Sequence, residues 1–160
     1  MEGKNAITIR ELIKCALRMR PDRIIVGEVR DAAAIDMLTA LNTGHDGSLS
    51  TGHANSPEDM LSRLETLVLM GMDIPLEAVR RQIASAIEII VHLGRLRDKS
   101  RRVLQIVEVL QVENRTIVTQ PLFEFVEEGE DARGRVLGTL QPTKYCLQQT
   151  EKLQRAGITL

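Results

Sequence analysis

One stretch of the sequence decides the fold: Arg20-Pro-Asp-Arg-Ile-Ile-Val-Gly-Glu-Val-Arg-Asp31. Its centre, Ile24-Ile-Val26, is an unbroken run of β-formers, which predicts a short strand buried on both faces, as in a parallel sheet covered by helices. The run ends in Gly27-Glu-Val-Arg-Asp31, where ionisable side chains gather. Because the chemistry of open α/β sheets lies beyond the carboxyl ends of their strands, Glu28 is a candidate catalytic carboxylate. A structural ion pair between Glu28 and Arg30 is an equally good interpretation of this stretch alone.

Composition limits the classes of function that the chain can serve. The 160 residues are 43% hydrophobic and 27% charged, an ordinary balance for a soluble globular protein. The 21 basic and 22 acidic residues nearly cancel and aromatic residues make up only 2%, so nothing favours nucleic-acid binding. Cys15 and Cys146 lack the spacing of a metal or redox site. No apolar run approaches the about 20 residues that span a bilayer, and we expect a cytoplasmic protein.

Capping signals and apolar stripes predict the elements of the first part of the chain. Residues 1–6 are polar, and we expect them to be disordered. Helices are predicted to begin at four positions: Thr8 (in a capping box with Glu11), Asp31, Ser56 and Pro75. Strands are predicted over Arg23–Val29, Ser48–Ala54 and Ile87–Leu93. Together these elements predict an α/β domain over residues 1–94, with a parallel sheet flanked by helices.

The pattern changes after Gly94, where we expect a second, β-rich domain over residues 95–160. Alternating residues predict antiparallel ribbons near Arg102–Val112 and Thr116–Val126. The remaining expected elements are an acidic turn at Glu127–Asp131, a short strand at Arg135–Leu140 and a last helix from Thr143 to Ala156. The basic connection Arg95–Arg102 and the acidic turn are interpreted as solvated loops in preference to docking surfaces.

A second group of polar residues follows the predicted strand, in Thr43-Gly-His-Asp-Gly47 and Thr51-Gly-His53. His45, Asp46 and His53 suggest a metal site, but a metal needs three or four ligands with supporting partners, and no further His or Cys cluster is near. A histidine at the end of a neighbouring strand suits a phosphate sensor better, because it can donate to a terminal phosphate oxygen. For His45, the capping of a turn is the favoured interpretation.

In this order and at this separation, the motifs resemble those of the type II/type IV secretion and type IV pilus ATPases. More narrowly, the chain resembles the Flp/Tad pilus-assembly branch. The residues that carry this resemblance are Arg20–Asp31, Asn42–Ser56, Ser62–Thr66, Arg81–Ala86 and Ser100–Val103. It covers about Ile7 to the C-terminus and is most specific between Arg18 and Arg97.

The resemblance implies the C-terminal part of a RecA-like P-loop NTPase core with a small appended β-rich subdomain. It implies that Glu28 is the base that orients water and, through the nucleotide, Mg²⁺, and that His53 lies near the terminal phosphate. The further residues implied to contact the nucleotide are Arg30, His45, Thr51 and Gly27. Gly27 stands in an atypical Walker B motif, at the position where many NTPases carry aspartate. It also implies ATP and Mg²⁺ as cofactors, a hexamer, and partners in a secretion or pilus platform at the cytoplasmic face of the inner membrane.

One part of the family's pattern is missing from this sequence. The Walker A loop, Gly-x-x-x-x-Gly-Lys-[Ser/Thr], should precede Walker B, but Gly3-Lys4 is followed by Asn5 and has no earlier glycine. The acidic, arginine-containing aspartate box is also missing. Without backbone N–H groups to hold the phosphates, we expect this chain to bind no nucleotide and hydrolyse no ATP by itself.

Three hypotheses about function follow from the sequence. The favoured hypothesis is the C-terminal half of a secretion or pilus-assembly motor ATPase. The alternative is a non-catalytic oligomerisation or docking module, and the least favoured is a metal-dependent hydrolase that uses His45, Asp46 and His53. Because an incomplete sheet leaves unpaired edges and an uncovered apolar face, we also expect the chain to self-associate.

Overall fold

The structure, a computed structural model, describes residues 6–159 and is mixed α/β. The expectation of disorder for residues 1–6 concerns mainly residues 1–5, which lie outside the described residues. Contacts divide the chain into two compact units. Unit 1 comprises Met1–Ile87 and Asn114–Thr116, and unit 2 comprises Glu88–Glu113 and Ile117–Leu160. The division lies seven residues before the predicted boundary after Gly94 because the strand that begins at Ile89 pairs within unit 2.

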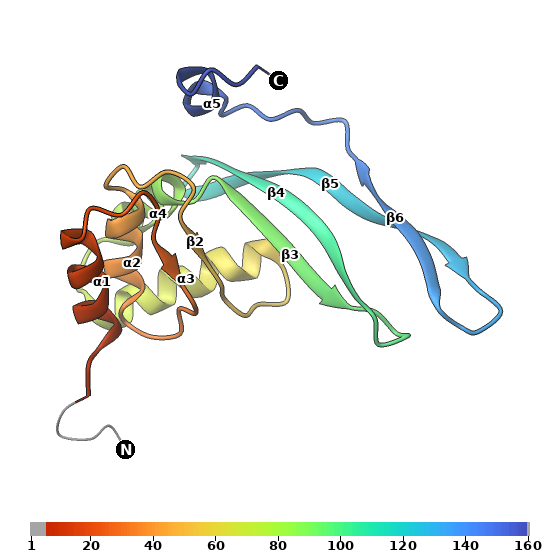
Figure 1. The fold of residues 1–160 in the computed structure, drawn as a ribbon, viewed down its shortest axis with the longest axis horizontal. Coiled ribbons are helices and arrows are strands. Elements are labelled where there is room, and N and C mark those ends of the chain that lie inside the picture. Colours follow the sequence, from red (N-terminus) through yellow and green to blue (C-terminus); the bar gives the residue numbers. More distant parts are fainter. Residues whose placement is uncertain (1–5, 160) are drawn as a thin grey trace. The chain divides into compact units, whose positions relative to one another are not determined.

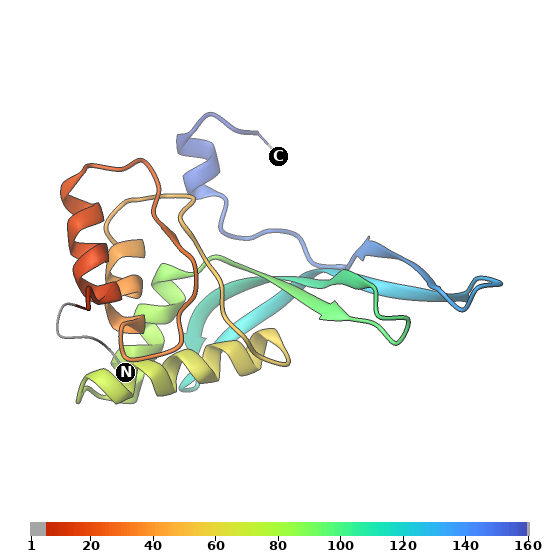
Figure 2. The same cartoon turned by 60° about the horizontal axis from the view of Figure 1, so that its bottom comes forward.

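Unit 1 contains four helices, and most of them begin where the sequence predicts. They are α1 (Ile9–Arg18), α2 (Ala34–Leu41), α3 (Pro57–Gly71) and α4 (Leu76–Ala86). The capping box of Thr8 and Glu11 is present, and the Ser56 hydroxyl accepts the N–H of Asp59 at 3.0 Å. Helix α2 contacts α1, α3 and α4, and Figure 2 shows it between α1 and α4. The side chains buried completely include Leu38, Val68, Val79 and Ile83.

The cap predicted at Asp31 is wrong, because a tight turn precedes α2. The N-cap residue is Ala33, which has no side-chain cap hydrogen bond. The Asp31 carboxylate instead accepts the N–H of Ala33 at 2.8 Å, and its carbonyl accepts the N–H of Ala34 at 3.1 Å. Asp31 therefore stabilises the turn that follows the strand and does not cap the helix itself.

The central strand is shorter and more exposed than the sequence predicts. Strand β1 (Ile25–Val26) pairs in parallel with β2 (Leu49–Ser50), and these two strands form the sheet of unit 1. Ile24 is 6% exposed, but Ile25 is 73% exposed, so the prediction of burial on both faces is wrong. Side chains alternate across a strand, and this small sheet buries one face only.

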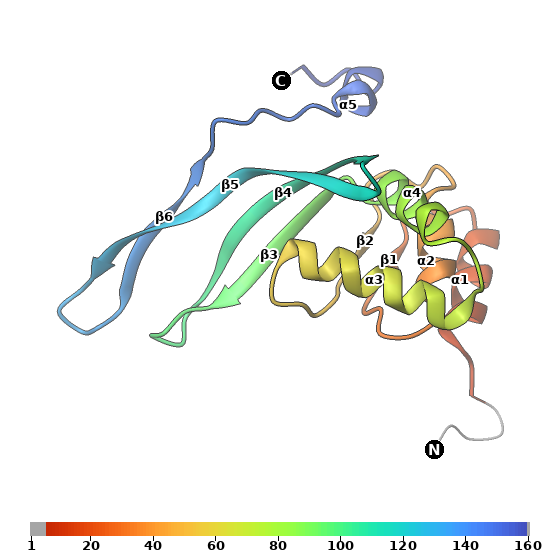
Figure 3. The same cartoon turned by 180° about the vertical axis from the view of Figure 1, so that it is seen from behind.

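Unit 2 is built on one sheet with the strand order β3-β4-β5-β6 (Figure 1). The strands are β3 (Ile89–Arg95), β4 (Arg101–Glu113), β5 (Thr116–Glu130) and β6 (Val136–Pro142). Pairing is antiparallel between β3 and β4 and between β5 and β6, as Figure 3 shows from behind. The two predicted ribbons and the predicted short strand are thereby confirmed.

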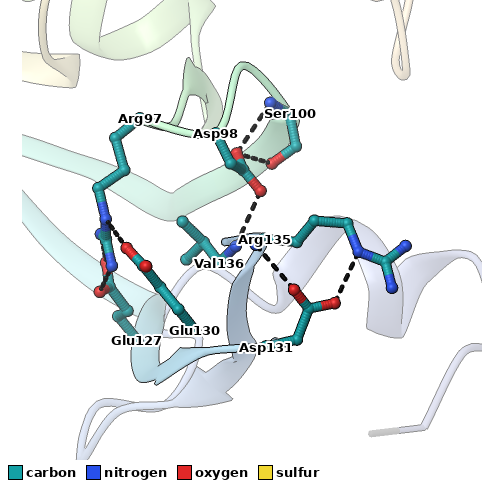
Figure 4. Close-up of polar contacts among 8 residues, drawn as sticks. All are labelled: Arg97, Asp98, Ser100, Glu127, Glu130, Asp131, Arg135 and Val136. Atoms are coloured by element: carbon teal, nitrogen blue, oxygen red, sulfur yellow. Dashed lines mark hydrogen bonds and ion pairs between the residues drawn. The ribbon is translucent and has the colours of Figure 1, made fainter. Parts of the chain in front are cut away.

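The acidic residues at Glu127–Asp131 lie mainly on a strand, so the prediction of an acidic turn is wrong. β5 continues to Glu130, and Arg97 binds its carboxylates from the β3–β4 turn (Figure 4). The guanidinium of Arg97 donates to Glu127 at 2.5 and 2.6 Å and to Glu130 at 2.6 Å. These hydrogen bonds raise the pKa of Arg97 and lower the pKa of Glu127. The basic connection Arg95–Arg102 and the acidic residues Glu127–Asp131 therefore pair in part with each other.

The last helix is also shorter than predicted. Helix α5 covers only Glu151–Arg155, and residues 143–150, here called the strap, form neither a helix nor a strand. The completely buried carboxylate of Glu108 accepts the backbone N–H groups of Gln148 at 3.1 Å and Gln149 at 2.8 Å. Because those N–H groups point at a carboxylate, they are not available to a helix that starts at Thr143.

Candidate functional site

The candidate site lies where β1 and β2 end, next to each other. Leu49 donates its N–H to the carbonyl of Ile24 at 3.0 Å, and Ile24 donates its own N–H to the Ser48 hydroxyl at 2.8 Å. These bonds set the register of the two parallel strands. Both strands then run toward the same edge, which is where Glu28 and His53 follow them in sequence.

Thr51 extends the pairing beyond the strands. Its hydroxyl donates to the carbonyl oxygen of Gly27 at 2.5 Å, and its own carbonyl accepts the N–H of Val29 at 3.1 Å. The residues before and after Glu28 are thus both bonded to Thr51. The segment that carries the acid is held against the segment that carries His53.

Glu28 and His53 are brought together by this arrangement. Glu28 Oε1 lies 3.5 Å from His53 Nε2, and the two side chains are 40% and 78% exposed. The pair therefore faces solvent, where a carboxylate can accept a proton from water and an imidazole can donate to an anion. The structural alternative of a Glu28–Arg30 ion pair is not found among residues 6–159, where the side chain near the Glu28 carboxylate is that of His53.

The space around Gly27 is open. A Cβ atom at this position would meet no atom within 4 Å, so packing within the chain does not require the glycine. Gly52 differs, because a Cβ there would lie 2.7 Å from Met60 Sδ. A ligand can consequently approach the backbone at Gly27 without displacing a side chain.

His45 contributes to the turn before β2 and not to the Glu28–His53 pair. Its Nδ1 lies 3.0 Å from the Thr43 hydroxyl, and its carbonyl accepts both the N–H of Ser48 at 3.2 Å and the hydroxyl of Ser48 at 2.7 Å. Since Ser48 in turn binds Ile24, this turn fixes the start of β2. Among residues 6–159, no hydrogen bond or ion pair joins His45 to Glu28 or His53.

Other classes of site are not found in the described part of the chain. Residues 6–159 contain no group of three or more His, Cys, Asp or Glu side chains placed to hold a metal ion. Within the same residues, no helix is long and apolar enough to cross a membrane.

Arg30 is exposed and follows the buried Val29, which places its backbone beside the site.

The sequence names Glu28 and His53 as candidates, and the structure places their side chains 3.5 Å apart, but the sequence does not predict the hydrogen bond that joins their two segments. The contact of Thr51 with a nucleotide stays a prediction, and in the structure the Thr51 hydroxyl donates to the Gly27 carbonyl. The one signal in the sequence is the place of Thr51, two residues before His53. Ser48, which links the His45 turn to β1, carried no signal.

Known proteins that are similar to this chain belong to secretion and conjugation systems. Residues 1–154 match the family model described as type II/IV secretion system protein. The chain is 44% identical over 115 residues to a protein named for conjugal transfer in Mycobacterium tuberculosis, covering 72% of this chain and 32% of that protein. It is 35% identical over 132 residues to the conjugal transfer protein TrbB of Rhizobium radiobacter, covering 82% of this chain and 40% of that protein.

A solved structure agrees with the fold. The crystal structure of the VirB11 ATPase from the Brucella suis type IV secretion system, in complex with sulphate, matches with a TM-score of 0.59 and 31% identity. The match covers 62% of this chain and 31% of that chain. This chain thus spans about a third to two fifths of the length of these relatives.

Proposed function

Because this chain belongs to the type II/IV secretion system protein family, we propose that it is the C-terminal part of a motor ATPase. The motor would couple ATP hydrolysis to the export of protein or pilin subunits. In this proposal, unit 1 contributes to a RecA-like core, and β1 with Gly27 and Glu28 forms its Walker B motif. Support comes from the similarity of the fold to the VirB11 ATPase.

The observation that carries the proposal is the Glu28–His53 pair at the ends of two parallel strands. Glu28 is the general base, which accepts a proton from the attacking water and orients it. His53 donates to the terminal phosphate, where negative charge gathers in the transition state. Gly27 leaves room for the phosphate end of the nucleotide, since no side chain lies within 4 Å of its missing Cβ.

ATP with Mg²⁺ supplies the phosphoanhydride that is cleaved and the charge that balances its oxygens. The residues present fit one side of such a group: a carboxylate, an imidazole and an open backbone position. They do not supply the phosphate cradle, because the Walker A sequence does not occur in this chain. We therefore propose that this chain alone is inactive and that the cradle lies in another part of the complete motor.

The partners proposed are the other subunits of a hexamer and the membrane proteins of a secretion or pilus platform at the inner face of the cytoplasmic membrane. Relatives named for conjugal transfer and for type IV secretion support export as the task. Assignment to the Flp/Tad pilus branch rests on the sequence segments quoted for it. The alternative docking function has less support, because Arg97, one of the charged residues that could bind a partner, pairs with Glu127 and Glu130 within the chain.

The proposal is tested in the complete motor with Glu28→Gln, which keeps the shape of the side chain and removes the base. We expect ATP hydrolysis to fall by about 100-fold or more, while the hexamer still assembles. Glu77→Gln is the matched control, since Glu77 is an exposed carboxylate on α4 that pairs with Arg81 in the next turn. Near-normal hydrolysis by the Glu28 variant would show that this carboxylate is not the base.

A further inference from the structure

We propose that Thr51 is a positioning residue, which holds the Glu28 carboxylate against His53 through its bond to the Gly27 carbonyl. This inference rests on the proposed ATPase function. In this inference Thr51 acts by binding the protein's own backbone at Gly27, and not by contact with the nucleotide.

The bonds of Thr51 enclose Glu28 from both sides. The side-chain hydroxyl binds the carbonyl of Gly27, the residue before Glu28, and the main-chain carbonyl binds the N–H of Val29, the residue after it. Val29 is also anchored by burial, at 3% exposure. The position of Glu28 relative to the second segment is thus fixed at two points, and Thr51 provides both.

The side-chain bond is the more important of the two for the acid. Gly27 has no side chain to anchor it, and a glycine backbone samples more conformations than any other residue. Glu28 itself is 40% exposed at its side chain, so packing does not fix it. Without the Thr51 hydroxyl, the peptide between Gly27 and Glu28 loses its bond to the opposite segment and can rotate.

His53 lies two residues after Thr51 on the segment that continues from β2. Thr51 accordingly fixes the backbone on both sides of Glu28, while its own segment carries His53 two residues later. The 3.5 Å separation of Glu28 Oε1 and His53 Nε2 depends on the hydrogen bonds by which Thr51 joins the two segments. A small displacement is enough to matter, since misplacement of a catalytic group by about 1 Å can cost 100-fold in rate.

The first experiment measures ATP hydrolysis by the complete motor with Thr51→Val and Thr51→Ser. Valine keeps the branched shape and removes the hydroxyl, while serine keeps the hydroxyl. We expect Thr51→Val to lower kcat by about 10- to 100-fold with KM for ATP nearly unchanged, and Thr51→Ser to restore most of the rate. Thr66→Val is the matched control, because the exposed Thr66 hydroxyl also donates to a backbone carbonyl, that of Ser62 on α3.

The second experiment uses the 160-residue chain and needs no activity. The ring-proton NMR signals of His53, assigned with His53→Gln, report its contact with Glu28. We expect Glu28→Gln to move these signals, Thr51→Val to move them in the same direction, and Thr51→Ser and Thr66→Val to leave them in place. This readout separates the two proposals, because it holds even if Glu28 is not the base of an ATPase.

The inference is overturned if Thr51→Val leaves the His53 signals unmoved while Glu28→Gln shifts them, or if neither variant shifts them. It is also overturned if the valine variant raises KM with kcat unchanged, since Thr51 would then bind nucleotide directly. Failure of serine to restore both the rate and the signals would equally contradict a task that depends on the hydroxyl.

Discussion

Gln149 donates its backbone N–H to the buried carboxylate of Glu108 across 2.8 Å, although 40 residues separate the two in the chain. Glu108 also accepts the N–H of Gln148 and the side-chain N–H of Gln120 at 2.6 Å. A carboxylate with no exposed surface is stabilised only where such donors replace water. Glu108 therefore holds the strap to the centre of the sheet.

We expect Glu108→Gln to release the strap and lower the free energy of unfolding of the chain by about 2 to 3 kcal/mol. The NH2 group of glutamine replaces one buried acceptor oxygen, so N–H donors that bind Glu108 lose their partner. Hydrogen–deuterium exchange should show lower protection at residues 146–150. Glu113→Gln, at the exposed end of the same strand, is the control and should change stability by less than about 0.5 kcal/mol. Equal protection of the strap in both variants would show that Glu108 does not hold it.

A pH-dependent contribution is expected from Asp98. The hydroxyl and N–H of Ser100 and the N–H of Val136 bind its carboxylate and lower its pKa from 3.8 to about 2. Since the folded pKa is depressed, the contribution is complete above about pH 4 and is lost as the pH falls toward 2. Denaturation from pH 6 to 2 should therefore show a steeper loss of stability in the wild type than in Asp98→Asn. Parallel curves would contradict this assignment.

The bonds of Arg97 to Glu127 and Glu130 predict a salt-sensitive contact between the β3–β4 turn and the end of β5 (Figure 4). Arg97→Ala should reduce hydrogen-exchange protection near the β5–β6 turn in low salt, with little change in global stability, because the ion pairs are half exposed. In 1 M salt, where charges are screened within about 3 Å, wild type and variant should become similar. Arg95→Ala is the control, since the Arg95 side chain donates to the carbonyl of Lys99 and forms no ion pair among residues 6–159.

Substitution by alanine should lower the free energy of unfolding at Gly71 but not at Gly27. A Cβ at Gly27 meets nothing within 4 Å, whereas one at Gly71 would lie 2.8 Å from the Cβ of Ala32. We expect Gly27→Ala to leave the free energy of unfolding unchanged within about 0.5 kcal/mol and Gly71→Ala to lower it by about 1 to 3 kcal/mol. Thermal unfolding of the two variants measures the difference. Strong destabilisation by Gly27→Ala would mean that this glycine serves the fold rather than the site.

The sequence by itself determined the features that depend on neighbours along the chain. The Thr8–Glu11 capping box and the Ser56 cap use partners three residues away, so a local pattern specifies them completely. The alternation of the long ribbons in unit 2 is local for the same reason. Glu28 and His53 could be named as candidates because each stands at the end of a short predicted strand.

Only the tertiary structure decided which distant residues meet. The exposure of Ile25, the pairing of Arg97 with Glu127 and the strap at Glu108 each depend on partners brought together from far along the chain. The same holds for Thr51 and Gly27, which are 24 residues apart. A hydrogen bond of this kind forms only after the register of β1 and β2 has been set, and no local pattern of residue types encodes that register.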